Sequence, residues 1–414
     1  MELLDKIYEA RERIKNVAVH TPLMKNENLS EEFSAQVFLK REDLQPVRSY
    51  KLRGAYNKIV LLCEEEKSRG VVCASAGNHA QGVAYACNQL NIKGTIFMPV
   101  TTPRQKTKQV KLFGKDKVEV VLKGDTFDEA SEEANRYCKE VGAVFIHPFD
   151  DLKVIAGQGT VGLELLEDSP KPIDYLFLPI GGGGLAAGII SVFKQLSPHT
   201  KIIGVEPVGA ASMKTSIEKG VNTTLQDIDN FVDGAAVKRV GEQTFEICKN
   251  TLEDIVLVPE GKVSTTILRM YNEEAIVVEP AGALTVSALD FYKDKIKGKN
   301  VVCVVSGSNN DITRMQEIKE RSLLYEGLKH YFLVQFPQRP GAFKQFVNDI
   351  LGPNDDIVYF QYSKKNNREI GPAVVGIELK DPADFTKIEE QLKHLNFVYR
   401  YLNEKPDLFI SFTP

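Results

Sequence analysis

Short apolar runs alternate with longer amphipathic stretches between residues 71 and 305. The runs are rich in β-branched residues and read GVVCAS, GTIFMP, KVEVVL, AVFIHP, DYLFLPI, KIIGVEP and NVVCVVSG. Several of them end in Gly, Ser or Pro, and most are followed by a helical pattern. This alternation predicts parallel strands joined by crossover helices, an α/β fold in which ligands bind beyond the carboxyl ends of the strands.

The pattern changes after residue 311, where a polar helical run leads into a shorter unit. This unit reads, in order, YFLVQF, a helix over about 342–351, IVYFQYS, the polar turn KKNNRE, AVVGIEL, a helix over about 383–395, and FVYRYL followed by DLFISF. The order strand, helix, strand, strand, helix, strand predicts an α+β ferredoxin-like domain. We therefore expect one domain over residues 1–324 and a second over residues 325–414.

Composition and charge narrow the classes of protein. The chain has 414 residues, 43% hydrophobic content and a formal net charge of -4, with acidic and basic residues mixed along its length. It is long enough for two or three domains with a large buried core. Because no basic block is present, nucleic acid is not an expected partner. The charged amino terminus lacks the apolar segment of a signal peptide, so we expect a cytoplasmic protein.

Two further kinds of partner are not expected. The uncharged stretch 175–193 has about the length that a bilayer requires. It contains Pro179 and four consecutive glycines, however, which favour a strand, a tight loop and a helix start over a membrane span. The six cysteines form no C-x-x-C pair and have no nearby His at metal-ligand spacing, so no metal site is predicted.

The segment SYKLRGAY, residues 49–56, places Lys51 among apolar residues. Taken alone, a lysine between a tyrosine and a leucine is more commonly a solvated helix residue. Apolar surroundings disfavour the charged ammonium, however, so the pKa of this lysine should fall. Its free amine would then be available as a nucleophile for a Schiff base.

Three other segments follow apolar runs. SAGNHAQG, residues 75–82, offers backbone N–H groups at a helix start, which suit a carboxylate or form a simple capped turn. GGGGL, residues 181–185, can aim several N–H donors at one anion, so a phosphate is the expected ligand. VVSGSN, residues 304–309, ends an apolar strand and is equally compatible with an ordinary turn.

A dinucleotide-binding fold is an alternative interpretation of the glycine run. Gly182, Gly184 and Gly188 follow a strand, and Glu206 ends the next strand about where a ribose-binding acid would lie. The spacing G-x-G-x-x-x-G departs from the usual form, and this alternative gives no role to SYKLRGA or SAGNHAQG. An NAD-dependent oxidoreductase is therefore kept as the alternative with different chemistry.

Taken together, these motifs resemble those of the fold type II, tryptophan-synthase-β-like pyridoxal-phosphate enzymes, whose serine and threonine dehydratases carry S-[FY]-K-x-R-G-A and S-x-G-N-H-x-Q-G. The resemblance implies a catalytic region of two subdomains, the smaller one inserted at about residues 54–155. It makes Lys51 the lysine that binds pyridoxal 5'-phosphate and later the base that removes the α-proton of the substrate. It makes Tyr50 a residue that packs beside the cofactor ring.

The same resemblance assigns the remaining site residues. Asn78 is expected to hydrogen-bond the 3'-oxygen of the cofactor and Ser306 its pyridine nitrogen, and a hydroxyl partner favours a neutral ring and elimination over transamination. The cofactor phosphate is expected against Gly181, Gly182, Gly183, Gly184 and Leu185. The substrate carboxylate is expected among Ser75, Gly77, Asn78 and His79. The segments EPAGA (279–283) and DGAAV (233–237) also resemble the dehydratases, and neither receives a catalytic role.

Residues from about Tyr325 resemble the ACT-like regulatory domain of biosynthetic threonine ammonia-lyases, so the resemblance covers essentially the whole chain. It implies deamination of L-threonine to 2-oxobutanoate and ammonia, the first step of isoleucine biosynthesis, with feedback regulation by isoleucine or valine. Relatives are dimers or tetramers, so a homo-oligomer is expected. An effector carboxylate could bind the backbone at Pro340, Gly341, Ala342 and Phe343, although the module could be only an oligomerisation surface.

Besides the NAD-dependent oxidoreductase, the sequence alone leaves three alternatives open. A catabolic serine/threonine dehydratase or a serine racemase would share the cofactor motifs, and the appended module favours the biosynthetic enzyme over both. A non-catalytic amino-acid sensor would use the small domain alone, and it leaves the lysine, asparagine and serine motifs without a purpose.

Overall fold

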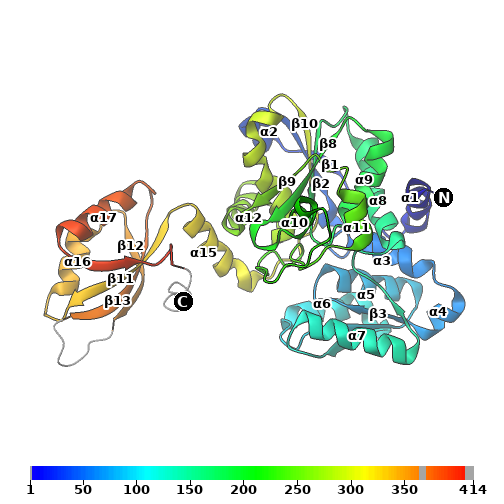
Figure 1. Ribbon diagram of the computed structural model, residues 1–414, viewed down its shortest axis with the longest axis horizontal. Coiled ribbons are helices and arrows are strands. Elements are labelled where there is room, and N and C mark those ends of the chain that lie inside the picture. Colours follow the sequence, from blue (N-terminus) through cyan, green and yellow to red (C-terminus); the bar gives the residue numbers. More distant parts are fainter. Residues whose placement is uncertain (1, 363–369, 406–414) are drawn as a thin grey trace. The chain divides into compact units, whose positions relative to one another are not determined.

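The computed structural model describes residues 2–362 and 370–405 (Figure 1). The chain divides into two compact units, Met1–Ile312 and Thr313–Pro414. The first unit contains two sheets of mainly parallel strands, and the second contains one antiparallel sheet.

The larger sheet of the first unit has six strands in the order β1-β2-β10-β7-β8-β9. These strands are β1 (Leu23–Lys25), β2 (Gln36–Arg41), β7 (Tyr175–Pro179), β8 (Lys201–Pro207), β9 (Asp254–Val258) and β10 (Asn300–Val305). All neighbours pair in parallel except β1 and β2. Parallel sheets are covered on both faces, which explains why β7 and β10 are mostly apolar and are buried along their whole length.

Helices cover both faces of this sheet. Leu176 and Val302 share a core with residues of α1 (Leu3–Ile14), α8 (Leu152–Asp168) and α9 (Gly184–Leu196). Successive side chains of a strand point to opposite faces, and Cys303 accordingly contacts Thr285 of α13 (Pro280–Ser287). The other helices are α2 (Glu27–Phe33), α10 (Ser212–Lys219), α11 (Glu242–Cys248), α12 (Glu260–Glu274) and α14 (Lys293–Ile296).

The smaller sheet of the first unit has four parallel strands in the order β5-β4-β3-β6. They are β3 (Val71–Ala74), β4 (Gly94–Met98), β5 (Val118–Leu122) and β6 (Val144–Phe145). The helices in this part are α3 (Lys51–Val60), α4 (Glu64–Arg69), α5 (Asn78–Leu90), α6 (Arg104–Gly114) and α7 (Phe127–Val141). Helix α7 begins at a capping box in which Thr126 accepts the N–H of Glu129.

The second unit begins with α15 (Met315–Tyr325) and continues as a four-stranded antiparallel sheet of order β12-β13-β11-β14. Its elements are β11 (Lys329–Pro337), α16 (Ala342–Ile350), β12 (Asp356–Tyr362), β13 (Ile370–Glu378), α17 (Asp384–His394) and β14 (Val398–Tyr401). Phe332 of the sheet packs with Phe346 and Leu392 of the two helices. The predicted ferredoxin-like order is confirmed, whereas the turn KKNNRE and the run DLFISF lie outside the described residues.

The predicted fold class is confirmed, because all seven apolar runs form strands and the strands within each sheet of the first unit are parallel apart from β1. The strands β1, β2 and β9 were not predicted. The uncharged stretch 175–193 forms β7, the glycine loop and most of α9. Among the described residues, no helix combines the length and apolar character needed to cross a membrane. The boundaries at residues 324 and 54–155 stay predictions.

Candidate active site

The carboxyl ends of β10 and β7 meet at one edge of the larger sheet because these strands are parallel neighbours. Ser306 follows β10, and the glycine loop 181–184 follows β7. The segment that leads to Lys51 lies against the first of these ends. The N–H of Tyr50 donates to the carbonyl oxygen of Ser306 at 3.3 Å, and Ser49 forms an antiparallel bridge with Gly307. Two predicted motifs, some 250 residues apart, are thus brought together.

Lys51 is the first residue of α3, and its Nζ donates to the carbonyl oxygen of Pro148 at 3.0 Å. The ring of Tyr50 lies nearby, with its centroid 5.4 Å from the same Nζ. Burial lowers the pKa of Lys51 to about 8, while the charge of Glu279 acts in the opposite direction. The predicted fall in the pKa of this lysine is therefore found, and its free amine is accessible near neutral pH.

Arg53, two residues further on, fixes the start of α3. Its guanidinium is 1% exposed and donates to Glu42 at 2.7 and 2.8 Å and to Glu164 at 2.6 and 2.9 Å. It also donates to Thr160 and to the carbonyl oxygen of Val19, both at 3.1 Å. A buried arginine with every N–H occupied holds backbone in place, so its function in the motif is structural.

Gly54, the next residue of the motif, allows two helices to pack closely. A Cβ at this position would lie 2.7 Å from the carbonyl oxygen of Val154. A Cβ on Gly157 of α8 would likewise lie 2.6 Å from the Cα of Gly54. The two glycines therefore allow α3 and α8 to touch, which sets the position of Lys51 relative to the larger sheet.

Asn78 begins α5 and is held at both ends of its amide group. Its Nδ2 donates to Oε1 of Glu279 at 2.6 Å, and its Oδ1 accepts from Nδ2 of Asn309 at 2.7 Å. Asn309 in turn donates to the carbonyl oxygen of Val47 at 2.9 Å. An amide nitrogen has two hydrogens, so one N–H of Asn78 remains for a ligand. Glu279 and Asn309 were not predicted as partners.

Ser75, Gly77 and His79 surround the start of α5. The N–H of Gly77 donates to Oγ of Ser75 at 3.2 Å, and a Cβ on Gly77 would meet no atom within 4 Å, so this stretch of backbone faces open space. Nε2 of His79 lies 2.8 Å from the carbonyl oxygen of Ile146. Burial lowers the pKa of His79 to about 3, with the charge of Lys51 adding to the effect. The imidazole is therefore neutral, with the proton on Nε2.

The glycine loop packs tightly against its neighbours. Gly183 has a φ of +90°, in the left-handed region that favours glycine. A Cβ on Gly182 would lie 2.2 Å from the ring of Phe149. The carbonyl oxygen of Gly182 accepts from Oγ1 of Thr244 at 2.7 Å and from the N–H of Gly241 at 3.3 Å. Because α9 begins at the end of this loop, its first N–H groups are available to an anion. Phe149 and Thr244 were not predicted.

Ser306 completes the group at the carboxyl end of β10. Its side chain is buried, and its Oγ donates to the carbonyl oxygen of Ala281 at 3.3 Å. At that length the hydrogen bond is weak, so the hydroxyl can turn to a better acceptor. These groups fit the parts of pyridoxal phosphate. The lysine of lowered pKa suits the amine-reactive carbonyl, and the fixed amide suits the 3'-oxygen. The glycine-rich helix start suits the phosphate, and the buried hydroxyl suits the ring nitrogen.

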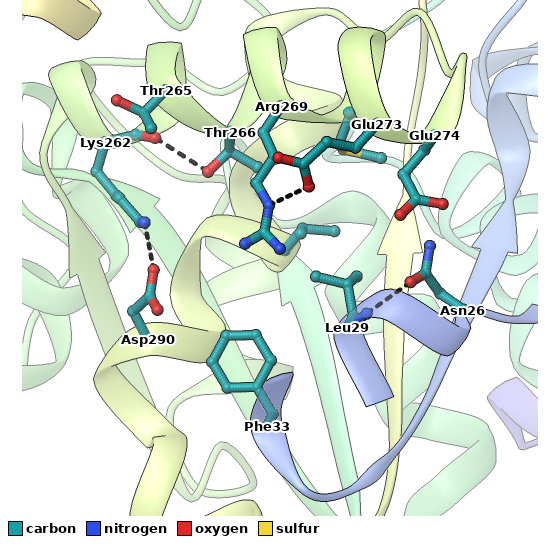
Figure 2. Close-up of a pocket in the computed structure, with 12 residues that line it drawn as sticks. Asn26, Leu29, Phe33, Lys262, Thr265, Thr266, Arg269, Glu273, Glu274 and Asp290 are labelled. Atoms are coloured by element: carbon teal, nitrogen blue, oxygen red, sulfur yellow. Dashed lines mark hydrogen bonds and ion pairs between the residues drawn. The ribbon is translucent and has the colours of Figure 1, made fainter. Parts of the chain in front are cut away.

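A small pocket lies apart from these residues, between α2 and α12 (Figure 2). Arg269 contacts Glu273 at 2.7 Å and Glu32 at 2.5 Å, and Lys262 pairs with Asp290. None of the predicted site residues lines it. Because its basic side chains are paired with carboxylates, this pocket differs from the sheet edge, where N–H groups remain for a ligand.

The α/β fold and the groups at this sheet edge define a pyridoxal-phosphate-dependent enzyme. The chain matches the family of pyridoxal-phosphate dependent enzymes over residues 14–307. It also matches the C-terminal regulatory domain of threonine dehydratase over residues 320–410. The predicted cofactor is thereby confirmed, and the dinucleotide interpretation of the glycine run is abandoned.

The chain belongs to the biosynthetic threonine dehydratases. It is 58% identical to the biosynthetic L-threonine dehydratase of Halalkalibacterium halodurans over 406 residues, which cover 98% of each chain. The corresponding protein of Bacillus subtilis is 57% identical over 97% of this chain and 96% of its own length. Among solved structures, the processed threonine deaminase isoform 2 of Solanum lycopersicum is 43% identical, with a TM-score of 0.74 over 78% of this chain and 88% of that one.

Proposed function

We propose that this enzyme deaminates L-threonine to 2-oxobutanoate and ammonia, as the first step of isoleucine biosynthesis in the cytoplasm. The observation that carries the proposal is the convergence of the Lys51, Asn78, glycine-loop and Ser306 segments at one sheet edge. The names and near-complete coverage of the relatives support the choice of threonine. The second unit distinguishes the chain from dehydratases and racemases that lack a regulatory domain.

Lys51 provides the amine in this proposal. When bound, pyridoxal phosphate supplies an electron sink for the charge that develops at the substrate Cα. Lys51 would hold the cofactor through its amine and would accept the α-proton of the substrate at Nζ. An ordinary lysine has a pKa of about 10.4, so a pKa of about 8 increases the share of free amine at neutral pH more than a hundredfold.

The other residues bind and orient. Asn78 would donate its remaining N–H to the 3'-oxygen, and Tyr50 would pack beside the ring. Ser306 would donate a hydrogen bond to the ring nitrogen, and a hydroxyl partner would leave the ring neutral, which favours loss of the β-hydroxyl. The backbone of Gly181, Gly182, Gly183, Gly184 and Leu185 would hold the phosphate. The substrate carboxylate lies at the start of α5, with Ser75, Gly77 and neutral His79 around it.

The second unit binds the end product, isoleucine, or valine. The supporting feature is the start of α16, where Gly341 has a φ of +83° and a Cβ there would meet no atom within 4 Å. In the turn from Pro340 to Phe343, the backbone N–H groups of Gly341 and Phe343 would donate to the amino-acid carboxylate. The ring of Phe343 lies 4.4 Å from that of Phe360, and such rings suit an aliphatic side chain. Isoleucine should move the threonine saturation curve, and light scattering should give a dimer or tetramer.

The test of the activity is release of 2-oxobutanoate from L-threonine, with Lys51→Ala assayed in parallel. L-Serine is supplied in separate reactions, and D-serine is measured as the product of a racemase. Turnover of threonine by the native chain, absent in a folded variant, would support the proposal. A yellow, cofactor-loaded native protein that leaves threonine unchanged would contradict it.

A further inference from the structure

A buried carboxyl group lies behind Asn78, in a segment to which the sequence assigned no role. Glu279 caps α13 and is 5% exposed. Its N–H donates to the carbonyl oxygen of Gly307 at 3.2 Å, and a Cβ on Gly307 would lie 2.4 Å from Oε1. The carboxylate therefore fills the space between α13, the start of α5 and the residue after Ser306.

The hydrogen bonds around Asn78 leave its amide a single orientation. A carboxylate oxygen only accepts, and the Nδ2 of Asn309 only donates, so a flipped Asn78 would face two mismatched partners. Glu279 thus decides which edge of the amide is left for a ligand. Without this carboxylate, the nitrogen of Asn78 would lose the partner that holds it.

The charge of Glu279 is set by groups on several elements. Burial and the charge of Asp233 raise the pKa of Glu279 to about 7. The hydrogen bond from Asn78 and the charge of Lys106 act in the opposite direction and lower this pKa. The charged or titratable groups that influence it or respond to it are Tyr50, Lys51, Lys106 and Asp233. Lys106 of α6 forms an ion pair with Asp233 at 2.6 Å. The chain next to this pair lies close to the carboxylate, since a Cβ on Gly234 would lie 3.6 Å from Oε1 of Glu279.

We propose that Glu279 is a positioning residue, which orients the Asn78 amide toward the cofactor and whose charge is controlled by the Lys106–Asp233 ion pair. The inference rests on the proposed contact of Asn78 with the 3'-oxygen. Both the ionised and the protonated carboxyl can accept from Asn78, so orientation persists through the titration. Only the ionised form raises the pKa of Lys51, so the electrostatic environment of the bound cofactor changes with pH.

Two substitutions separate orientation from charge. Glu279→Gln keeps an acceptor for Asn78 but cannot ionise, whereas Glu279→Ala removes both. Cofactor-free protein is titrated with pyridoxal phosphate to obtain a Kd, and the visible absorption and circular dichroism of the loaded protein are recorded from about pH 5.5 to 8.5, on either side of the Glu279 pKa. Neither readout requires turnover.

The expected results differ between the two variants. Glu279→Ala should weaken cofactor binding about tenfold or more, because a hydrogen bond to a charged group is lost. Glu279→Gln should bind within about threefold of the native Kd but lose the spectral inflection near pH 7. Lys106→Gln should move that inflection to higher pH, since the cation that favours the carboxylate is gone, and Asp233→Asn should move it lower.

Matched controls make the outcome decisive. Glu206 is another buried carboxyl with a pKa raised to about 7, held by the N–H groups of Met213 and Lys214, so Glu206→Gln should leave the inflection in place. Asn78→Ala tests the underlying contact separately, and loss of cofactor affinity is expected. An inflection that survives in Glu279→Gln would overturn the proposal. So would weak binding by Glu279→Ala combined with native binding by Asn78→Ala, since Glu279 would then act by another route.

Discussion

Lys51 and Arg53 are two basic residues in one helical turn, yet their surroundings are opposite. Arg53 has two carboxylates within hydrogen-bond distance, and these raise the pKa of the guanidinium even though burial acts against it. Lys51 donates to one backbone carbonyl, and burial lowers the pKa of its amine to about 8. The motif therefore contains one cation that is stabilised for structure and one that is destabilised for chemistry, and substitution of each should have a different result.

Loss of the amine should have the largest effect. Lys51→Ala is expected to reduce threonine turnover at least about a thousandfold, because a nucleophile and base is removed, while thermal stability stays close to native. Turnover is measured by 2-oxobutanoate release and folding by circular dichroism. Substantial activity in the folded variant would mean that another lysine binds the cofactor.

Loss of the guanidinium should instead destabilise the fold. Arg53→Met leaves Glu42 buried without its ion-pair partner and Glu164 with Lys40 alone, which should cost about 3–5 kcal/mol of unfolding free energy. Denaturant titration measures the change. Arg136, which pairs with Glu133 on the surface, is the control, and Arg136→Met should leave the midpoint unchanged. Equal midpoints for the two variants would contradict a structural role for Arg53.

Crowding of the glycine loop should have a smaller effect, which we expect on the affinity for the cofactor alone. Gly182→Ala brings a methyl group against the ring of Phe149, and overpacking of this kind costs about 1–3 kcal/mol, so the Kd for pyridoxal phosphate should rise about tenfold. The double variant with Phe149→Leu should recover part of the affinity. A Gly182→Ala protein that binds as tightly as native would show that the loop does not shape the phosphate site.

The smallest expected effect is a shift in the pH at which the Lys51 amine becomes reactive. In the cofactor-free protein, Lys51 should reach half its maximal rate with an amine reagent near pH 8, because the protonated form below that pH is unreactive. Exposed lysines should do so near about pH 10.4. Glu279→Gln should lower the Lys51 midpoint further, as the carboxylate that favours the ammonium is gone. Peptide mass spectrometry follows each lysine, and a Lys51 midpoint equal to that of exposed lysines would contradict the low pKa.

The sequence predicted seven strands of the first unit from their apolar runs, and it missed β1, β2 and β9. β2 contains Lys40, which looks like a surface residue in the sequence but is fully buried and contacts Glu164 at 2.7 Å. Nothing in a local pattern reveals that a lysine has a carboxylate partner on a distant helix. A charged residue inside a short apolar run therefore concealed β2, which lies beside β10 in the larger sheet.

The same limit applies to the site. Motifs predicted Lys51, Asn78 and Ser306 as site residues because each belongs to a compact segment with recognisable neighbours. Glu279 is 201 residues from Asn78, and the contact between them arises only when the chain folds. Partners of this kind follow from topology, so a single sequence predicts candidate ligand-binding residues more readily than the residues that hold them in place.

The position of β10 in the larger sheet has a consequence for folding during synthesis. β10 is the last strand of the first unit, yet it lies between β2 and β7 in the middle of the larger sheet. While a ribosome is still adding residues before 300, the sheet has an empty central position, and the bridge from Ser49 to Gly307 cannot form. Cofactor capture must therefore wait until nearly the whole unit has emerged, and the nascent chain depends on long-range closure that is slow and exposed to aggregation.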